Sequence, residues 1–293
     1  AELAALVASA PAGCVRRHTR SALAPAPATT PARFPVVVFS HCHACTRYDM
    51  AEISERLASH GIVVAAPDHL RNTLWDQRAG STVVPGPSFL QVRASDISSV
   101  LDRLLDPAAP ELPVELRGRI DGARAGVMGH SFGGATTGRV VVTDDRFVAA
   151  MSVAAPINPF LVVDLDAVRV PYLFVLAQED NSITELGNYV LRKNYERVEV
   201  PAWLVELHDA GHWSPSDLCG LVALFAAGCG AGERQTAPGE PFTYVDPAIA
   251  RERTADAAAG FFARFLLDDP AGTAFVDRLG EPGLVTVTSH AAE

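Results

Sequence analysis

Residues 125–134 read AGVMGHSFGG and contain the pattern G-x-S-x-G around Ser131. The apolar run Ala125–Met128 predicts a buried strand, and the small residues that follow it are typical of a tight turn that opens a helix. Glycine at 129 and 133 lets neighbouring backbone approach closely, and such a turn lifts the serine hydroxyl clear of the sheet. Ser131 is therefore the predicted nucleophile.

Other short apolar runs, rich in β-branched residues, occur on both sides of this motif. Strands that are apolar on both faces are typical of a parallel sheet covered by helices. The predicted strands are Val36–Phe39, Ile62–Ala66, Ala125–Met128, Phe147–Val153, Tyr172–Ala177 and Trp203–Leu207.

Helical patterns alternate with these strands. Asp49 and Glu52 have the spacing of a capping box, and Gly61 predicts the end of that helix. Apolar residues between 97 and 105 recur with helical spacing, and residues 249–266 predict a last amphipathic helix. The alternation predicts an α/β protein with a mostly parallel central sheet and helices on both of its faces.

The 293 residues are 48% hydrophobic and contain no apolar run of bilayer length, which predicts a soluble globular protein without stable membrane insertion. We expect one domain over residues 1–293. Residues 1–35 are expected to be an irregular or edge-strand lead-in, residues 213–245 an excursion beside the sheet, and the tail from Asp268 is weakly patterned. The first residues lack a basic segment and do not resemble an intact signal peptide.

The formal net charge is −10. Nucleic acids and anionic membranes attract clustered Lys and Arg, so neither is an expected partner. The expected partner is a small-molecule, lipid or polymer substrate, and the sequence does not define an oligomeric state.

A serine nucleophile needs a base that follows it in the chain. His212 lies in the loop DAGHW and is the predicted base. His208 ends the strand before it and is expected to be a strand-end histidine whose side chain pairs with backbone. The histidines that precede or adjoin the serine have the wrong order for this role.

The third catalytic member must orient the imidazole and stabilise its protonated form. Asp180 follows the strand Tyr172–Ala177 and is the predicted acid. Glu179 is the first alternative, after a one-residue slip, and the loop with Asp164 and Asp166 is the second.

An oxyanion needs two backbone N–H donors. Phe132, after the serine, and His43, in the loop after the first central strand, are the predicted donors; the His43 side chain is not required for this role. Cys42 and Cys45 flank His43 with C-x-x-C spacing. They lack a second Cys/His pair, so no metal is expected, and unbonded neighbours are favoured over a structural or redox-active pair.

Cys219 and Cys229 bracket a short apolar segment after the His212 loop. We expect them to form a disulfide if the protein is exported to an oxidising compartment. A secreted or periplasmic protein is the favoured prediction, with a cytoplasmic protein as the alternative.

The segments FPVVVFSHCHACTRYDMAEISERLASHGIVVAAPDHLRNT, GRIDGARAGVMGHSFGG and DAGHWSPSDLC together resemble bacterial α/β-hydrolases related to platelet-activating-factor acetylhydrolase, often labelled predicted dienelactone hydrolases. The resemblance covers residues 34–219. It implies a single-domain α/β-hydrolase fold and ester hydrolysis through an acyl-serine, without a cofactor. One departure is visible: Cys42 stands where the family usually has glycine, at the oxyanion loop.

The resulting hypothesis is a serine carboxylic-ester hydrolase. An acyltransferase on the same three residues and a non-catalytic ligand-binding hydrolase fold are the alternatives. The acyl site is expected to use aromatic side chains from loops, with ordinary packing as the alternative role for each of them: Trp75, Phe89, Phe160 and Trp213.

Overall fold

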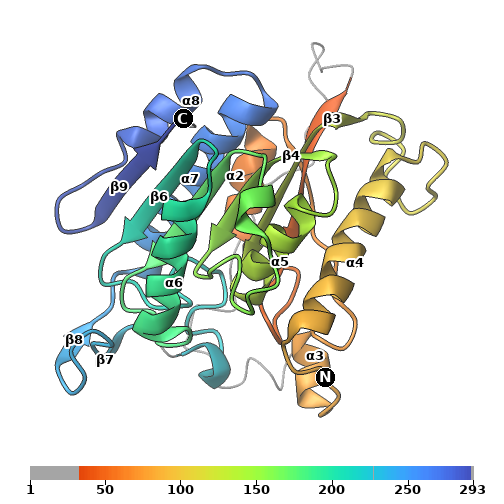
Figure 1. Cartoon of the computed structure of the whole chain (residues 1–293). Coiled ribbons are helices and arrows are strands. Elements are labelled where there is room, and N and C mark those ends of the chain that lie inside the picture. The colour runs from red at the N-terminus through yellow and green to blue at the C-terminus, as the bar shows by residue number, and fades with distance from the viewer. Residues whose placement is uncertain (1–32, 227, 292–293) are drawn as a thin grey trace.

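The computed structural model describes residues 33–226 and 228–291, so most of the lead-in lies outside the described residues. A seven-stranded sheet forms the centre of the molecule, in the order β2-β1-β3-β4-β5-β6-β9 (Figure 1). All neighbouring pairs are parallel except β6 and β9. The strands are β1 (Phe34–Ser40), β2 (Val63–Ala65), β3 (Ile120–His130), β4 (Phe147–Val153), β5 (Tyr172–Ala177), β6 (Ala202–Leu207) and β9 (Val285–His290).

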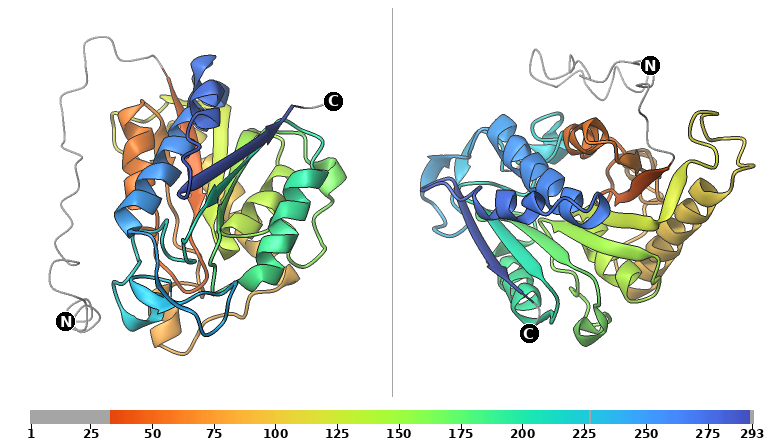
Figure 2. Two further views of the ribbon diagram at one scale, coloured as in Figure 1. Left: turned by 90° about the vertical axis from the view of Figure 1, so that its left-hand side faces the viewer. Right: turned by 90° about the horizontal axis from the view of Figure 1, so that it is seen from above.

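Helices cover both faces of this sheet, as the two further views show (Figure 2). Alternate residues of the strands point to opposite faces, so β1 sends Val37 and Phe39 into one apolar core and Val36 and Val38 into the other. The first core includes α2 (Ala51–Ser59), α7 (Pro247–Leu266) and α8 (Ala271–Asp277). The second includes α4 (Pro87–Leu105), α5 (Phe132–Val141) and α6 (Thr184–Arg197).

The prediction of an α/β-hydrolase-type architecture is therefore confirmed. Two predicted strands, Phe147–Val153 and Tyr172–Ala177, have the expected bounds, and the ends of the others differ by at most five residues. The helix predicted around residues 97–105 begins earlier, at Pro87. The amphipathic pattern is interrupted in the first half of this helix, because the charged residue Arg93 lies on the inner face and is fully buried.

The tail from Asp268 is more regular than its weak pattern predicts. It forms α8 and then β9, which pairs antiparallel with β6 and closes one edge of the sheet. Only one residue of β9 is fully buried, Val285, so the strand lacks the continuous apolar run of the central strands.

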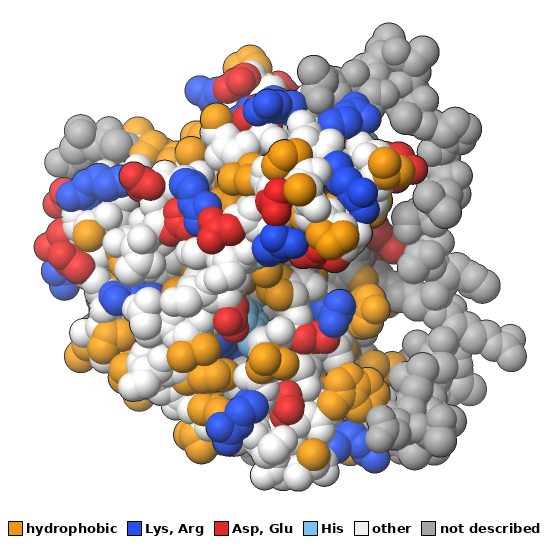
Figure 3. All heavy atoms as spheres, turned by 90° about the vertical axis from the view of Figure 1, so that its right-hand side faces the viewer, with side chains coloured by type: hydrophobic (Ala, Val, Ile, Leu, Met, Phe, Trp, Pro, Cys, Tyr) orange, Lys and Arg blue, Asp and Glu red, His pale blue; other side chains and the backbone are white. Residues whose placement is uncertain are grey.

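The excursion predicted at residues 213–245 contains a short 3-10 turn at Ala223–Phe225 and an antiparallel two-stranded ribbon of β7 (Ala231–Glu233) and β8 (Pro241–Thr243). The small helix α3 (Leu74–Arg78) belongs to an earlier loop. The ribbon projects beside α6 and the end of β6 (Figure 1). Acidic, basic and hydrophobic side chains are mixed on the face drawn in Figure 3. Within the described residues no helix has both the length and the apolar character required to cross a membrane.

Candidate active site

The turn between β3 and α5 presents Ser131. Its φ of 55° and ψ of −124° lie in a region that L-residues rarely adopt. The turn is possible because glycines flank it. A Cβ atom on Gly129 would lie 2.2 Å from the Gly133 oxygen, and one on Gly133 would lie 1.9 Å from the Ser40 oxygen. Both glycines are thus required by close backbone approach, as the G-x-S-x-G pattern predicts.

Asp180 and His212 meet at the carboxyl edge of the sheet. Asp180 follows β5, and its Oδ1 accepts hydrogen bonds from the backbone N–H groups of Ser182 and Ile183, both at 2.9 Å. Its Oδ2 lies 2.7 Å from Nδ1 of His212. Both side chains are buried, and Nε2 of His212 has no hydrogen-bond partner among the described residues. The imidazole is thus held at one nitrogen and open at the other.

His130, the residue before Ser131, connects the nucleophile turn to the His212 loop. Its ring centroid lies 5.0 Å from that of His212, and its Nε2–H donates to the His212 carbonyl oxygen at 3.0 Å. The structure thus pairs Asp180 with His212 and places Ser131 one residue from His130, which contacts the His212 loop. The three residues follow the chain order expected for this fold.

The alternative acids have other partners. Glu179 is buried and accepts hydrogen bonds from Arg234 and from the backbone of Thr236, so it fastens the segment after β7. Asp164 caps the 3-10 turn Leu165–Ala167, and Asp166 pairs with Arg197 at the surface. None of the three contacts His212.

His208 is not paired through its side chain with backbone as expected. Its Nε2 lies 2.8 Å from the Thr286 hydroxyl, and its backbone N–H donates to Leu284. Both partners belong to the C-terminal segment whose weak pattern does not predict a strand. This pairing therefore could not be predicted from the sequence.

Ser131, His43 and Phe132 line one cavity of about 480 Å³. Phe132 is the first residue of α5, so its N–H is one of the unpaired donors of a helix N-terminus. The His43 N–H has no hydrogen-bond partner among the described residues. The other lining residues are Ser182 and ten residues without a polar side-chain group: Pro85, Ala135, Ala155, Pro156, Pro159, Phe160, Ile183, Leu186, Gly187 and Val190.

Of the four aromatic residues expected at the acyl site, only Phe160 lines this cavity. Phe89 and Phe160 pack against the Phe132 ring, each with centroids 6.2 Å apart. Trp213, the residue after His212, is buried, with its ring 4.8 Å from that of His212. Trp75 lies in α3 and is 40% exposed.

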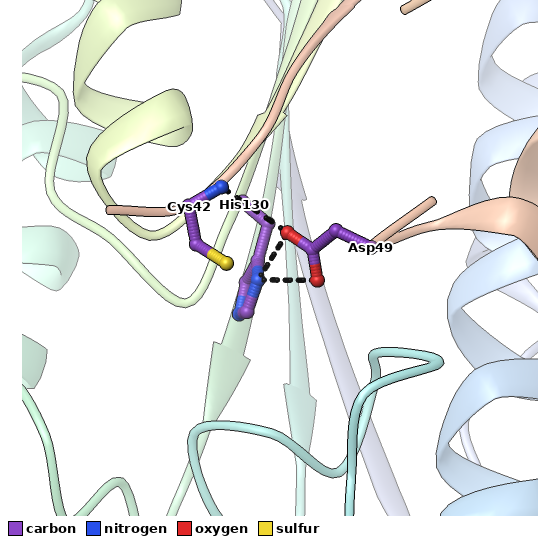
Figure 4. Close-up of side chains that lie close together, drawn as sticks. All are labelled: Cys42, Asp49 and His130. Carbon is purple, nitrogen blue, oxygen red and sulfur yellow. Dashed lines mark hydrogen bonds and ion pairs between the residues drawn. The ribbon is translucent and has the colours of Figure 1, made fainter. Parts of the chain in front are cut away.

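Asp49 does not cap α2, so the predicted capping box is wrong. The N-cap residue is Met50, without a side-chain cap, and Asp49 is fully buried. Its carboxylate accepts from the Cys42 N–H at 3.2 Å and from Nδ1 of His130 at 2.9 Å (Figure 4). The spacing Asp49 to Glu52 resembles a cap, but a buried histidine attracts the carboxylate more strongly.

Both ring nitrogens of His130 therefore donate, one to Asp49 and one to the His212 carbonyl, which requires the protonated ring. Burial lowers the pKa of His130, but the charge and hydrogen bond of Asp49 outweigh it and raise the pKa above its ordinary value. This buried ion pair links the loop with Cys42 and His43, the Ser131 turn and the His212 loop. We call Asp49 and His130 the clasp.

Cys42, Asp49 and His130 also have the residue types of a metal site, and their ligand atoms lie within 4.8 Å of one another. The donor set does not fit a metal. Cys42 is bonded to Cys45 and has no thiolate, and His130 has no lone pair left.

Both cysteine pairs are disulfides, Cys42–Cys45 and Cys219–Cys229. The second agrees with expectation, whereas Cys42 and Cys45 are not the unbonded neighbours that the sequence favoured. The two disulfides pack in one apolar cluster with Trp213. The bond to Cys45 restrains Cys42, which precedes His43 and stands where the family usually has glycine.

The structure contains a second hydrogen-bonded set of serine, histidine and aspartate that no sequence motif indicates. Ser40 Oγ lies 3.0 Å from Nε2 of His69, and Nδ1 of His69 lies 2.8 Å from Oδ2 of Asp96. Arg93 donates to Ser40 Oγ at 2.9 Å, so the Ser40 hydroxyl proton goes to His69. Ser40 and His69 are fully buried. Burial first, and then the Arg93 charge, hold the pKa of His69 well below its usual range.

Comparison with known proteins shows the family to which the chain belongs. Residues 23–217 match the model of the PETase family, described as PET hydrolase-like. Cutinase 2 of Thermobifida cellulosilytica is 30% identical over 184 residues, which cover 62% of this chain and 62% of that protein. Platelet-activating factor acetylhydrolase of Canis lupus familiaris is 30% identical over 166 residues, 45% of this chain and 37% of that protein.

Among solved structures, the ferulic acid esterase from Streptomyces cinnamoneus superimposes with a TM-score of 0.68 at 25% identity, covering 88% of this chain and 74% of that chain. The chain spans about three fifths or less of the length of the curated relatives named above. The family model matches most of the chain, and the resemblance to acetylhydrolase-related proteins is confirmed. The chain belongs to the PET hydrolase-like family of α/β-hydrolases.

Proposed function

We propose that this protein is a serine hydrolase that cleaves carboxylic esters. The observation that carries the proposal is His212, held by Asp180 at 2.7 Å through Nδ1 and open at Nε2 beside the Ser131 turn. Such an imidazole can take a proton from a serine hydroxyl and return it to a leaving group. The names cutinase, acetylhydrolase and esterase among the relatives support the same chemistry.

In the proposed first step Ser131 Oγ attacks the ester carbonyl carbon, and its proton passes to Nε2 of His212. Asp180 stabilises the imidazolium. The carbonyl oxygen becomes an oxyanion that accepts hydrogen bonds from the backbone N–H groups of His43 and Phe132. The C–O bond to the alcohol then breaks, and the alcohol leaves with the proton from His212.

In the second step His212 takes a proton from water, and the resulting hydroxide equivalent attacks the acyl-serine. The free acid leaves and Ser131 regains its proton. No cofactor enters either step. The largely apolar walls of the cavity favour an uncharged ester with an apolar part, and the exposed Leu186 at the wall extends that apolar surface outward.

The test is a panel of p-nitrophenyl esters from acetate to palmitate, run beside a phospholipid and a polyester film. We expect turnover of the simple esters and covalent labelling of Ser131 by a fluorophosphonate. A folded protein that neither hydrolyses any of these esters nor reacts with the fluorophosphonate would exclude the proposal. Labelling of another serine would move the site.

We also propose that residues 1–293 act as one domain and that the protein works outside the cytoplasm, in a secreted or periplasmic location. Two disulfides support an oxidising compartment. Mass mapping under non-reducing conditions tests this location. Free thiols at all four positions in protein purified from its natural source would contradict export.

A further inference from the structure

The side chain of His43 has a role that backbone geometry alone does not reveal. His43 lines the cavity together with Ser131, and its imidazole contacts Asn72. What that contact means depends on which atom of Asn72 faces the ring. A second contact of Asn72 decides this.

Arg93 donates from Nη1 to the Asn72 side chain at 2.7 Å. A guanidinium has no acceptor atom, so the Asn72 atom that faces Arg93 is the oxygen, Oδ1. Asn72 therefore turns its Nδ2 toward His43, at 2.7 Å from Nδ1 of the ring. Arg93 and Asn72 are both fully buried, so this orientation is fixed within the core.

An amide NH₂ can only donate, so Nδ1 of His43 must accept. The neutral ring then carries its proton on Nε2. Burial, followed by the charge of Arg93, holds the pKa of His43 below its ordinary value, in agreement with a neutral ring. The His43 Nε2 faces away from Asn72 and has no hydrogen-bond partner among the described residues.

The remaining walls of the cavity offer little that could bind a polar group. Apart from His43, the lining side chains carry only two polar groups, the hydroxyls of Ser131 and Ser182. A single oriented donor in an apolar wall is the kind of group that selects among substrates, because leaving it unpaired in a complex costs affinity.

We propose that the His43 imidazole is a specificity-determining donor that selects esters carrying a second acceptor oxygen, a ketone, ether or further ester, besides the scissile carbonyl. Asn72 and Arg93 are positioning residues that fix its tautomer. The proposal rests on the proposed ester hydrolysis. It assigns the side chain a task separate from that of the backbone N–H of the same residue.

The experiment compares esters that differ at one position. p-Nitrophenyl 4-oxopentanoate and p-nitrophenyl 5-oxohexanoate are each paired with the unsubstituted ester of equal chain length, and every kcat/KM is divided by the rate constant for hydroxide-catalysed hydrolysis. In the wild type we expect the oxo ester of at least one pair to be preferred by roughly three- to tenfold, the effect of one hydrogen bond.

His43→Phe keeps the backbone N–H and the ring shape but removes the donor, so the preference should fall to about one. His43→Gln places an amide N–H near the position of Nε2 and should restore part of the preference. A preference in His43→Phe equal to that of the wild type, or none in the wild type for either pair, would overturn the proposal. Absence of hydrolysis of every ester by folded wild type would instead refute the proposed function.

The tautomer can be tested without any substrate. In ¹⁵N NMR spectra of the wild type, the signals missing from His43→Phe belong to His43. We expect a protonated Nε2 and an unprotonated Nδ1 at pH 7.5. The reverse assignment would overturn the proposal, because the cavity would then face an acceptor.

Discussion

Ser131, Asp180 and His212 lie at the carboxyl edge of the sheet, where Ser131 lines a cavity, whereas the same three residue types recur in Ser40, His69 and Asp96, whose serine and histidine are fully buried. In the first set the imidazole Nε2 is open. In the second set Nε2 accepts the proton of Ser40, and Arg93 occupies the other side of that hydroxyl. We call them the open set and the sealed set.

The comparison shows that residue types and hydrogen bonds do not by themselves make a catalytic site. The sealed set satisfies its hydrogen bonds internally and holds Arg93. Through Arg93 it supports the loop after β1, because Arg93 also donates to the His41 carbonyl oxygen. The open set leaves one base nitrogen unpaired and one serine at a turn with access to solvent. The proposed proton transfer requires an imidazole nitrogen without a hydrogen-bond partner, whereas stability requires that buried polar groups be hydrogen-bonded.

The largest expected difference between the sets is at the serines. Ser131→Ala should lower kcat for p-nitrophenyl butyrate by about 10⁵-fold or more, because the nucleophile is lost. Ser40→Ala should lower kcat by about tenfold or less but reduce the free energy of unfolding by about 1–3 kcal/mol, because Arg93 and His69 lose a buried partner. Steady-state kinetics and urea unfolding measure the two effects. Equal losses of kcat in Ser131→Ala and Ser40→Ala would contradict the assignment of different roles to the two sets.

The aspartates should differ next. Asp180→Asn should cost about 10⁴-fold in kcat, because the amide favours the wrong tautomer of His212. Asp96→Asn should cost only a few-fold, because the Asp96 side chain is 40% exposed and does not face the cavity. Asp166→Asn, at the surface beside Arg197, is the matched control and should leave kcat unchanged. A collapse of activity in Asp166→Asn would assign the acid to the earlier loop.

The clasp should give a smaller loss of rate and a large loss of stability. Asp49→Asn leaves the buried His130 without a counter-charge, which should reduce the free energy of unfolding by about 3–5 kcal/mol. Loosening of the base loop should lower kcat by about 10- to 100-fold while KM changes little. Wild-type kcat in a destabilised Asp49→Asn protein would show that the clasp stabilises the fold without positioning the catalytic groups.

The free energy of unfolding should also depend on pH, in opposite directions for His41 and His130. Burial, and then Arg93, lower the pKa of His41, next to the sealed set, to about 3. As the pH falls from 6.5 toward 3 the unfolded chain takes up this proton before the folded one, so stability falls. His130 has a raised pKa, so its contribution is complete below its ordinary value and is lost as the pH rises through the folded-state pKa.

Urea unfolding at a series of pH values measures both limbs. His41→Asn should flatten the acid limb, because the group that titrates there is gone. Asp49→Asn should flatten the alkaline limb. An unchanged acid limb in His41→Asn would assign that limb to other groups, such as His69.

The sequence predicts the central strands because their apolar runs are continuous. It predicts the Ser131 turn because close backbone approach requires glycine at 129 and 133. Ser131 and His212 follow from chain order and turn geometry, and Asp180 from its place after β5. The sealed set and the clasp could not be predicted. They depend on which buried polar groups meet across the fold, and Asp49 and Glu52 have a local spacing that points to another role. β9 was missed because its exposed face removes the apolar run.

The shared apolar cluster of the two disulfides also affects how the active protein is made. Cys42, Cys45, Cys219 and Cys229 can pair among themselves in three ways. The native pairing closes segments with sequence separations of 3 and 10, and short loops close with the smallest entropic cost. Both other pairings would tie Cys42 and Cys45 to Cys219 and Cys229 across more than half of the chain.

Such a crosslink would join the oxyanion loop to the segment after His212 inside a chain that is otherwise close to its native shape. Mispaired molecules would therefore be compact and inactive. In an oxidising expression host, the fraction of active molecules, rather than the amount of protein, should then rise when a disulfide isomerase is supplied.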